Sequence, residues 1–342
     1  MSPLYDAEDV EAAMERFRDV PLGHPFDVAD GITARYANAG HMLGSASISL
    51  TVKERNKTRT VVFSGDLGPA DFALIQDAVP FKSADLVFME STYGDRDHKP
   101  VKETLAEFRA IIDETVERKS RILVPAFAVG RTQQIMYHLD ELFCSGKVKP
   151  FPVYLDSPMA IEATKIYRSH PDLFDDEARS LESACKITRS QHQVTPTPTA
   201  QQSMKLNEAP GPCLIMAGSG MCNAGRIVHH LRHGLWQPET AVMFVGYQGQ
   251  GTLGRQLVDG AKAVKIFGET VAVKARIHTL NGFSAHAGQS GLLKWFQSMA
   301  SSKPKVVLVH GEARGREPLA ERLRKLHGVR TALPNLGDVI NF

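Results

Sequence analysis

The sequence predicts an α/β protein in which a β-rich layer is interrupted by an inserted α/β domain and then resumes. Apolar runs typical of strands dominate residues 1–93 and return after Gly268. Between them, strands alternate with amphipathic helices at short spacing. Such alternation is typical of βαβ units around a parallel sheet flanked by helices. We therefore expect three segments, with bounds 1–93, 94–268 and 269–342.

The first segment opens with a short amphipathic helix, expected over residues 9–17. Strand-like runs follow, over residues 32–36, 46–52, 60–63 and 85–90. The last of these, DLVFME, is almost continuously apolar, which is typical of a strand buried on both faces. This part of the chain therefore predicts a sheet with little helix.

The pattern changes in the second segment. Leu105, Phe108, Ile112 and Val116 recur at helical spacing. Strands are then expected over 121–127, 152–156, 212–220 and 240–249, with helices over 132–143, 160–170 and 226–235. The polar, proline-containing residues 187–203 predict a loop. In the third segment we expect strands over 270–280 and 305–312 and a helix over 289–299.

Bulk composition excludes several classes of protein. A length of 342 residues suggests about two domains. The net charge of +2 means that nucleic-acid contacts would come from a local basic cleft. Four cysteines without a C-x-x-C pair argue against a thiolate zinc site and a disulfide framework, and favour the cytoplasm. We expect no membrane segment, because no apolar run approaches the roughly 18–20 residues that a span needs.

Five polar side chains stand just past the ends of expected strands or in small-residue turns, where they can converge. They are His41, Asp66, Glu90, His286 and His310. Each also has a structural interpretation: Asp66 can cap a turn, Glu90 can pair with Arg96 or Arg131, His286 can cap a helix, and His310 can bond a backbone carbonyl. Their shared placement at one edge favours a functional cluster.

The second segment also carries a candidate phosphate-binding pattern. AGSGMCNAGR, with Ser219, Gly220 and Arg226, is a glycine-rich turn before a helix, where backbone amides can bind an anion. Arg131 and Arg255 stand at two further turns, and arginine binds phosphate in a bidentate manner. The His229-His230 pair is interpreted as structural or surface.

Nine motifs occur in a fixed order along almost the whole chain: AGHMLGSA, FSGDLG, ESTYGDR, PAFAVGRTQ, LDSPMA, GSGMCNAGR, VGYQGQGTLGR, FSAHA and LVHGE. This set resembles the β-CASP group of metallo-β-lactamase-fold nucleases. The group includes the messenger-RNA 3′-end cleavage factor, its prokaryotic relatives and, more distantly, ribonuclease J. The resemblance implies a hydrolase acting on single-stranded RNA, with an inserted β-CASP domain.

The resemblance also implies a role for each of the five residues. His41 matches a ligand of a first zinc, Asp66 the carboxylate that bridges two zincs, and His310 a ligand of the second zinc. His286 matches the general acid for the leaving oxygen, and Glu90 the carboxylate that orients it. Two zinc ions of this kind activate water and hold a phosphodiester for in-line attack.

The sequence departs from the family pattern in one respect. The family's H-x-H-x-D-H run supplies two ligands to each metal, and it does not occur among these residues; the only histidine before His41 is His24, which does not fit. The resemblance therefore predicts an incomplete metallo-β-lactamase αββα sandwich and at most one weakly held zinc ion. Truncation, a split reading frame and evolutionary loss all remain open as explanations.

Two functions follow from this departure. The first is a fragment or truncated form of a zinc-dependent, RNA-cleaving enzyme, either endonucleolytic or 5′-exonucleolytic, that is inactive or weak as written. The alternative is a non-catalytic RNA-binding scaffold that forms homo-oligomers or pairs with an active homologue.

Overall fold

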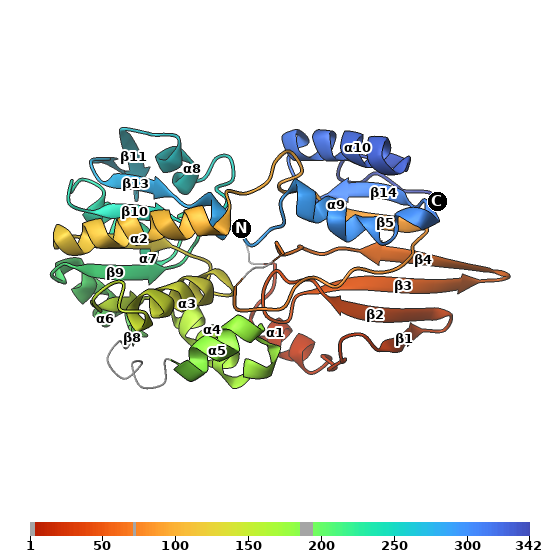
Figure 1. The fold of residues 1–342 in the computed structure, drawn as a ribbon, viewed down its shortest axis with the longest axis horizontal. Helices are drawn as coiled ribbons and strands as arrows, with labels where there is room; N and C mark the ends of the chain where they lie inside the picture. The colour runs from red at the N-terminus through yellow and green to blue at the C-terminus, as the bar shows by residue number, and fades with distance from the viewer. Residues whose placement is uncertain (1–3, 71–72, 185–193) are drawn as a thin grey trace.

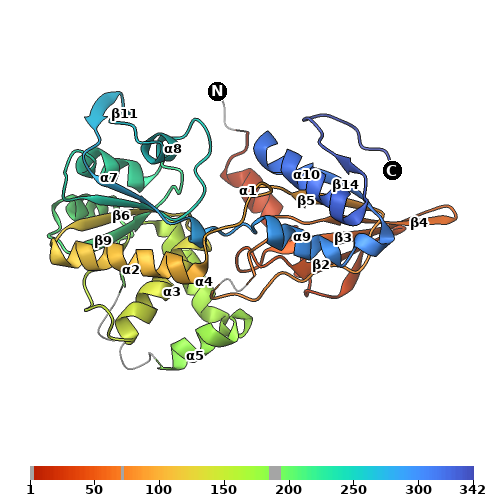
Figure 2. The same cartoon turned by 45° about the horizontal axis from the view of Figure 1, so that its top comes forward.

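The computed structural model describes residues 4–70, 73–184 and 194–342, which form two lobes that lie side by side (Figure 1). One lobe is built on a seven-stranded sheet and the other on a six-stranded sheet. The chain starts in the first lobe, crosses to the second before helix α2 (Val101–Glu117) and returns before helix α9 (Gln289–Gln297) (Figure 2). The expected α/β class, with an inserted domain, is confirmed.

The seven-stranded sheet contains strands from both ends of the chain. Its first four strands pair antiparallel, and β4, β5, β14 and β15 pair in parallel. In spatial order the strands are β1 (Pro25–Ala29), β2 (Ile32–Asn38), β3 (Ala46–Glu54), β4 (Lys57–Phe63), β5 (Leu86–Glu90), β14 (Lys305–Val309) and β15 (Thr331–Ala332). The C-terminal segment thus completes a sheet that the N-terminal segment begins.

One face of this sheet is covered by α9 and α10 (Ala313–His327). Val62, Val87 and Leu308 of three neighbouring strands are fully buried there against Trp295 and Phe296 of α9 and other residues of both helices. Burial of side chains of this size contributes about 1.5–3 kcal/mol each. This covered face is the hydrophobic core of the first lobe.

The opposite face of the same sheet is apolar and remains partly open. Val61, Leu86 and Val307 pack there with Ile340 of the C-terminal segment. Phe63 stacks on Phe88 with ring centroids 4.8 Å apart, yet Phe63 is 37% exposed. The sequence alternation that buries Val62 therefore presents its neighbour Phe63 to solvent.

The six-stranded sheet is parallel throughout and lies in the second lobe. In spatial order its strands are β13 (Arg276–Thr279), β10 (Ala241–Phe244), β6 (Arg121–Pro125), β9 (Cys213–Ala217), β7 (Val153–Leu155) and β8 (Val194–Pro196). A short hairpin, β11 (Ala263–Ile266) and β12 (Glu269–Ala272), lies beside it.

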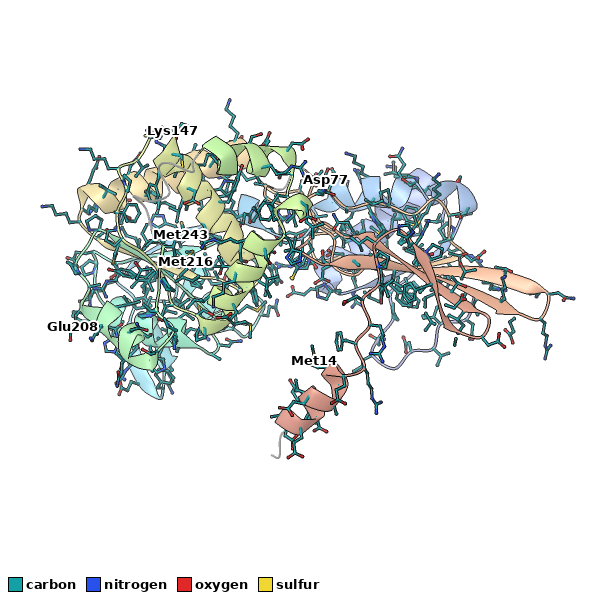
Figure 3. All side chains as sticks on the ribbon, turned by 90° about the horizontal axis from the view of Figure 1, so that it is seen from below. Met14, Asp77, Lys147, Glu208, Met216 and Met243 are labelled. Atoms are coloured by element: carbon teal, nitrogen blue, oxygen red, sulfur yellow. The ribbon has the colours of Figure 1, made fainter. Side chains whose placement is uncertain are left out.

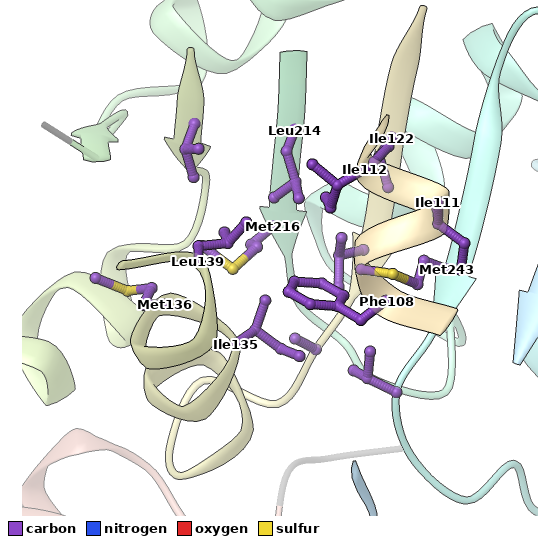
Figure 4. Close-up of a cluster of buried hydrophobic side chains, with 14 of the residues drawn as sticks. Phe108, Ile111, Ile112, Ile122, Ile135, Met136, Leu139, Leu214, Met216 and Met243 are labelled. Carbon is purple, nitrogen blue, oxygen red and sulfur yellow. The ribbon is translucent and has the colours of Figure 1, made fainter. Parts of the chain in front are cut away.

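Helices cover both faces of this second sheet. Figure 4 shows one side, where Phe108 and Ile112 of α2 pack with Ile135 of α3 (Arg131–Cys144). Ile227 and Leu231 of α7 (Arg226–Gly234) pack on the other side. The strands are apolar on both faces because both faces are covered. The remaining helices are α4 (Pro158–Ser169), α5 (Asp176–Ala184), α6 (Ala200–Lys205) and α8 (Leu253–Val258).

Three sequence expectations require correction. β13 pairs in parallel with β10, so the first lobe resumes after Thr279 and not after Gly268. The expected loop over 187–203 contains β8, which adds to the edge of the sheet at β7, and the start of α6, capped by Thr199; residues 187–193 lie outside the described residues. Cys144 is disulfide-bonded, although no disulfide framework was expected, whereas Cys213 and Cys222 are free and buried.

Helix α1 (Ala7–Met14) stands away from both lobes, as Met14 shows in Figure 3. A capping box at Asp6 and Asp9 stabilises its first turn, and none of its residues is buried. Among the described residues, none of the helices has the length and apolar character required to cross a bilayer.

The two faces of the first sheet give opposite predictions for neighbouring positions on β4. Phe63→Lys should cost only about 1–2 kcal/mol in the free energy of unfolding, because the lysine reaches water, and it should reduce self-association. Val62→Lys should cost at least about 4 kcal/mol, because it buries an unpaired charge. Urea denaturation and sedimentation velocity measure both effects. Equal destabilisation by the two substitutions would show that the Phe63 face is covered in solution.

Candidate active site

Four strands of the first sheet run in the same direction and end at the same edge. β2 and β4 both pair antiparallel with β3, and β5 and β14 are parallel to β4. His41, Asp66, Glu90 and His310 follow or end these strands. His286 lies between β13 and α9, where the chain returns from the second lobe. The five residues predicted from the sequence therefore converge at the boundary between the lobes.

His41 is buried and its orientation is fixed by the backbone. Its Nδ1 lies 2.9 Å from the carbonyl oxygen of Ala285, so Nδ1–H donates and Nε2 keeps its lone pair. Burial, followed by the proximity of His286, lowers the pKa of His41. The imidazole is therefore held neutral, which is the form that binds a metal.

Asp66 lies between two imidazoles. Its Oδ2 is 3.9 Å from Nε2 of His41, and its Oδ1 is 3.4 Å from Nδ1 of His310. Gly65, which precedes it, has a φ of +58°, which allows the tight turn after β4. The two carboxylate oxygens thus face separate imidazole nitrogens, at distances longer than a good hydrogen bond.

Glu90, which is buried, pairs with His286, which is partly buried. His286 Nδ1 lies 3.1 and 3.2 Å from the two carboxylate oxygens of Glu90, which also accepts hydrogen bonds from the backbone amides of Leu67 and Thr92. Burial alone would raise the pKa of Glu90, but the hydrogen bond from His286 and these amides hold it below its ordinary value. The partner of Glu90 is therefore His286, and not Arg96 or Arg131, the two partners that the sequence left open.

The carboxylate in turn controls His286. Burial alone would lower the pKa of His286, but the hydrogen bond to Glu90 and its negative charge raise it. Because Nδ1 is bound to Glu90, Nε2 is the nitrogen left to act on a substrate. A protonated His286 at this position can donate a proton to a developing oxyanion.

The donor set fits zinc. Zinc binds imidazole nitrogen and carboxylate oxygen at about 2.0–2.2 Å, so two ligand atoms on one ion lie at most about 4.4 Å apart. The His41–Asp66 separation of 3.9 Å and the His310–Asp66 separation of 3.4 Å both satisfy this limit. Ligand atoms of His41, Asp66 and His286 lie within 4.8 Å of one another, as do those of Glu90, His286 and His310.

Two site residues were missed by sequence reasoning. The hydroxyl of Thr92 lies 3.2 Å from Nδ1 of His310 and donates to the His310 carbonyl. His98 donates from Nε2 to the His286 carbonyl at 2.7 Å, and burial lowers its pKa. Thr92 follows Glu90 closely in the ESTYGDR motif, so that motif was the available signal. His98 stands in the sequence DHKP, which matches no motif.

A cavity of about 710 Å³ adjoins this cluster between the lobes. Tyr247 of the second lobe donates to Glu312 of the first at 2.6 Å and accepts from Arg314 at 3.0 Å. The backbone amide of Leu43 donates to the hydroxyl of Tyr167 at 3.0 Å. These bonds join the lobes around the cavity.

Only some of the predicted phosphate-binding residues line the cavity. Arg131 and Gly220 line the cavity. Arg131 is buried, which lowers its pKa to about 10, and its guanidinium contacts Gln134. Arg255 is bonded to Asp259 at 2.8 Å, and Ser219 accepts from the amide of Ala224; neither residue is among those that line this cavity. Their phosphate-binding role stays a prediction.

Arg226 belongs to a buried network centred on Asp156. Asp156 is fully buried and lies 2.8 Å from Arg226, 2.6 Å from Nε2 of His230 and 2.6 Å from the hydroxyl of Ser203. Burial alone would raise the pKa of Asp156, but these hydrogen bonds lower it to about 2. The network joins β7 to α7, and it gives His230 the structural role that was expected.

Two family models match the chain. The Beta-Casp domain model matches residues 132–257, within the second lobe. The model of a Zn-dependent metallo-hydrolase RNA specificity domain matches residues 270–334, which include His286 and His310. The matched families therefore agree with the metal-type donor set at the lobe boundary.

The proteins similar to this chain include a ribonuclease, an RNase J-like protein and a transcription termination factor. Ribonuclease TTHA0252 of Thermus thermophilus is 40% identical over 98% of this chain and 75% of its own length. Transcription termination factor FttA of Thermococcus kodakarensis is 30% identical over the whole chain, which spans only 54% of that factor. An RNase J-like protein of Methanocaldococcus jannaschii is 28% identical over 99% of the chain and 78% of its own length. The chain belongs to the β-CASP family of metallo-hydrolase RNA nucleases.

The Asp156 network predicts a specific dependence of stability on pH. A carboxylate whose pKa is lowered by folding contributes stability above its unfolded pKa of about 3.9, and this stability is lost as pH falls toward 2. Between pH 5 and pH 2, wild type should lose about 2 kcal/mol more than Asp156→Asn. Urea unfolding at several pH values measures this difference.

The control is Asp176→Asn, because the Asp176 side chain is 93% exposed. This variant should keep the wild-type dependence on pH. An Asp156→Asn variant that follows the wild-type curve would contradict the role given to the buried carboxylate.

Proposed function

We propose that this chain carries part of the active site of a zinc-dependent ribonuclease that hydrolyses phosphodiester bonds of single-stranded RNA, as an endonuclease or a 5′-exonuclease. The observation that carries the proposal is the position of Asp66, whose two carboxylate oxygens face His41 and His310 separately. Beside it, Glu90 holds His286 in one orientation. We also propose a cytoplasmic location, where RNA substrates occur.

Each residue of the cluster then has a defined role. His41, Asp66 and His310 would hold zinc, which would supply Lewis acidity and activated water when bound. His286 donates a proton from Nε2 to the leaving oxygen of the scissile phosphate, and Glu90 stabilises the charged imidazole before transfer. The raised pKa of His286 keeps the proton available toward neutral pH.

We further propose that residues 1–342 by themselves have little or no activity. The H-x-H-x-D-H run that the family resemblance requires is not among them. His41 and His310 lie on either side of the Asp66 carboxylate. These three ligands are fewer than two zinc ions need. RNA binding does not depend on the missing ligands, so it should persist.

A second role is favoured by the partly open apolar face that contains Phe63. Such a face is typical of an interaction surface. We therefore keep the alternative of a non-catalytic RNA-binding partner that pairs with an active homologue or with itself.

The test is cleavage of an end-labelled single-stranded RNA by the 342-residue chain in the presence of zinc or manganese. We expect no cleavage above the level of His286→Ala, because the ligand set is incomplete. His24→Ala is the matched control, since His24 lies outside the cluster.

Two outcomes decide between the accounts. Cleavage that disappears in His286→Ala and returns with zinc after chelation would show that these residues suffice for activity. If the purified chain is added to an active homologue and the mixture cleaves more RNA than the homologue alone, the partner role is favoured.

A further inference from the structure

The residues that line the cavity beside the five-residue cluster differ between the lobes. The polar wall comes from the first lobe and the segment that returns to it, and includes Asp66, His286 and Glu312. The second lobe supplies the apolar wall, which includes Phe127, Met159 and Met221 although Arg131 and Gln248 also line the cavity. Phe127 is 51% exposed and Met159 is 68% exposed, although each adjoins a well-packed core. Apolar side chains beside a few polar groups are typical of a ligand pocket.

Phe127 is held by its backbone and presents its ring to the cavity. The hydroxyl of Thr132 donates to the Phe127 carbonyl at 2.8 Å, and the amide of the preceding Ala126 donates to the carbonyl of Ala217 at 3.1 Å. A Cβ added at Gly220 would lie 2.7 Å from the Phe127 ring, so that ring rests directly on the backbone of the glycine-rich turn. The Phe127 ring therefore has one side against the glycine-rich turn and is half exposed.

The two methionines complete the surface around this ring. Met159 lies in the first turn of α4, and Met221 follows Gly220 in the glycine-rich turn. Thioether side chains are polarizable and adapt to flat aromatic partners. The aromatic ring and the two thioethers offer a flat, adaptable apolar surface without specific hydrogen bonds. Such a surface suits a planar ligand whose shape varies.

We propose that Phe127, with Met159 and Met221, forms a subsite that stacks one unpaired nucleobase next to the scissile phosphate. The inference rests on the proposed function, because the phosphate must lie at Asp66 and His286. The cavity then contains both parts of one nucleotide, with its charged phosphate at the polar wall and its flat base at the apolar wall. Stacking uses the π-face that every base has, so the subsite tolerates any base.

The experiment measures binding of the full chain to a short fluorescent single-stranded RNA by anisotropy. The Phe127→Leu variant should bind roughly 5- to 150-fold more weakly, which is the loss expected for one stacked base. Phe127→Tyr should stay close to wild type, because the aromatic face is kept. The matched control is Phe267→Leu, since Phe267 is 58% exposed on the β11–β12 turn and is not among the residues lining the cavity; it should bind like wild type.

An oligonucleotide with abasic sites separates stacking from a structural effect. Wild type should bind this RNA weakly, and Phe127→Leu should bind it equally weakly. If Phe127→Leu weakens abasic and normal RNA by the same factor, or leaves normal RNA unaffected, the base subsite is wrong while RNA binding stands. If wild type binds no single-stranded RNA at all, both the subsite and the proposed function are overturned.

Discussion

The common direction of β2, β4, β5 and β14 is the constraint on which the site depends. Backbone pairing in the seven-stranded sheet fixes the ends of these strands at one edge. Because side chains just past strand ends have no sheet neighbours to pack against, they are available for chemistry. His41, Asp66, Glu90 and His310 meet there although 269 residues separate the first from the last.

The segment that returns from the second lobe to the first contributes the rest of the site. His286 comes from the segment that returns from β13, and the carbonyl of Ala285 in the same segment fixes the tautomer of His41. A movement of this segment would therefore change the proposed general acid and a proposed metal ligand together. Two hydrogen bonds across the boundary oppose such a movement, one from the Leu43 amide to Tyr167 and one from Tyr247 to Glu312. The activity that we propose is thus a property of the boundary and not of either lobe.

Much of the fold followed from sequence patterns, because apolar periodicity reflects burial directly. The alternation of strands and helices between residues 94 and 268 predicted the inserted domain. The strand ends and small-residue turns predicted the five site residues. The place of β13 in the second sheet could not be predicted, because its four residues, RIHT, carry no apolar pattern that assigns the strand to one sheet. Arg226 looked like a phosphate ligand from its glycine-rich turn, yet Asp156, 70 residues away, binds it. Patterns within one segment do not contain such distant pairings.

Zinc binding at equilibrium tests the central claim most directly, namely that Asp66 is a zinc ligand between His41 and His310. Dialysis of the 342-residue chain at neutral pH, followed by metal analysis, should find no more than one zinc ion per chain. Asp66→Asn should weaken its binding by at least about 10-fold, because a ligand is lost. Asp27→Asn on the exposed strand β1 should bind zinc like wild type. Two zinc ions retained by wild type, or undiminished binding by Asp66→Asn, would contradict the account.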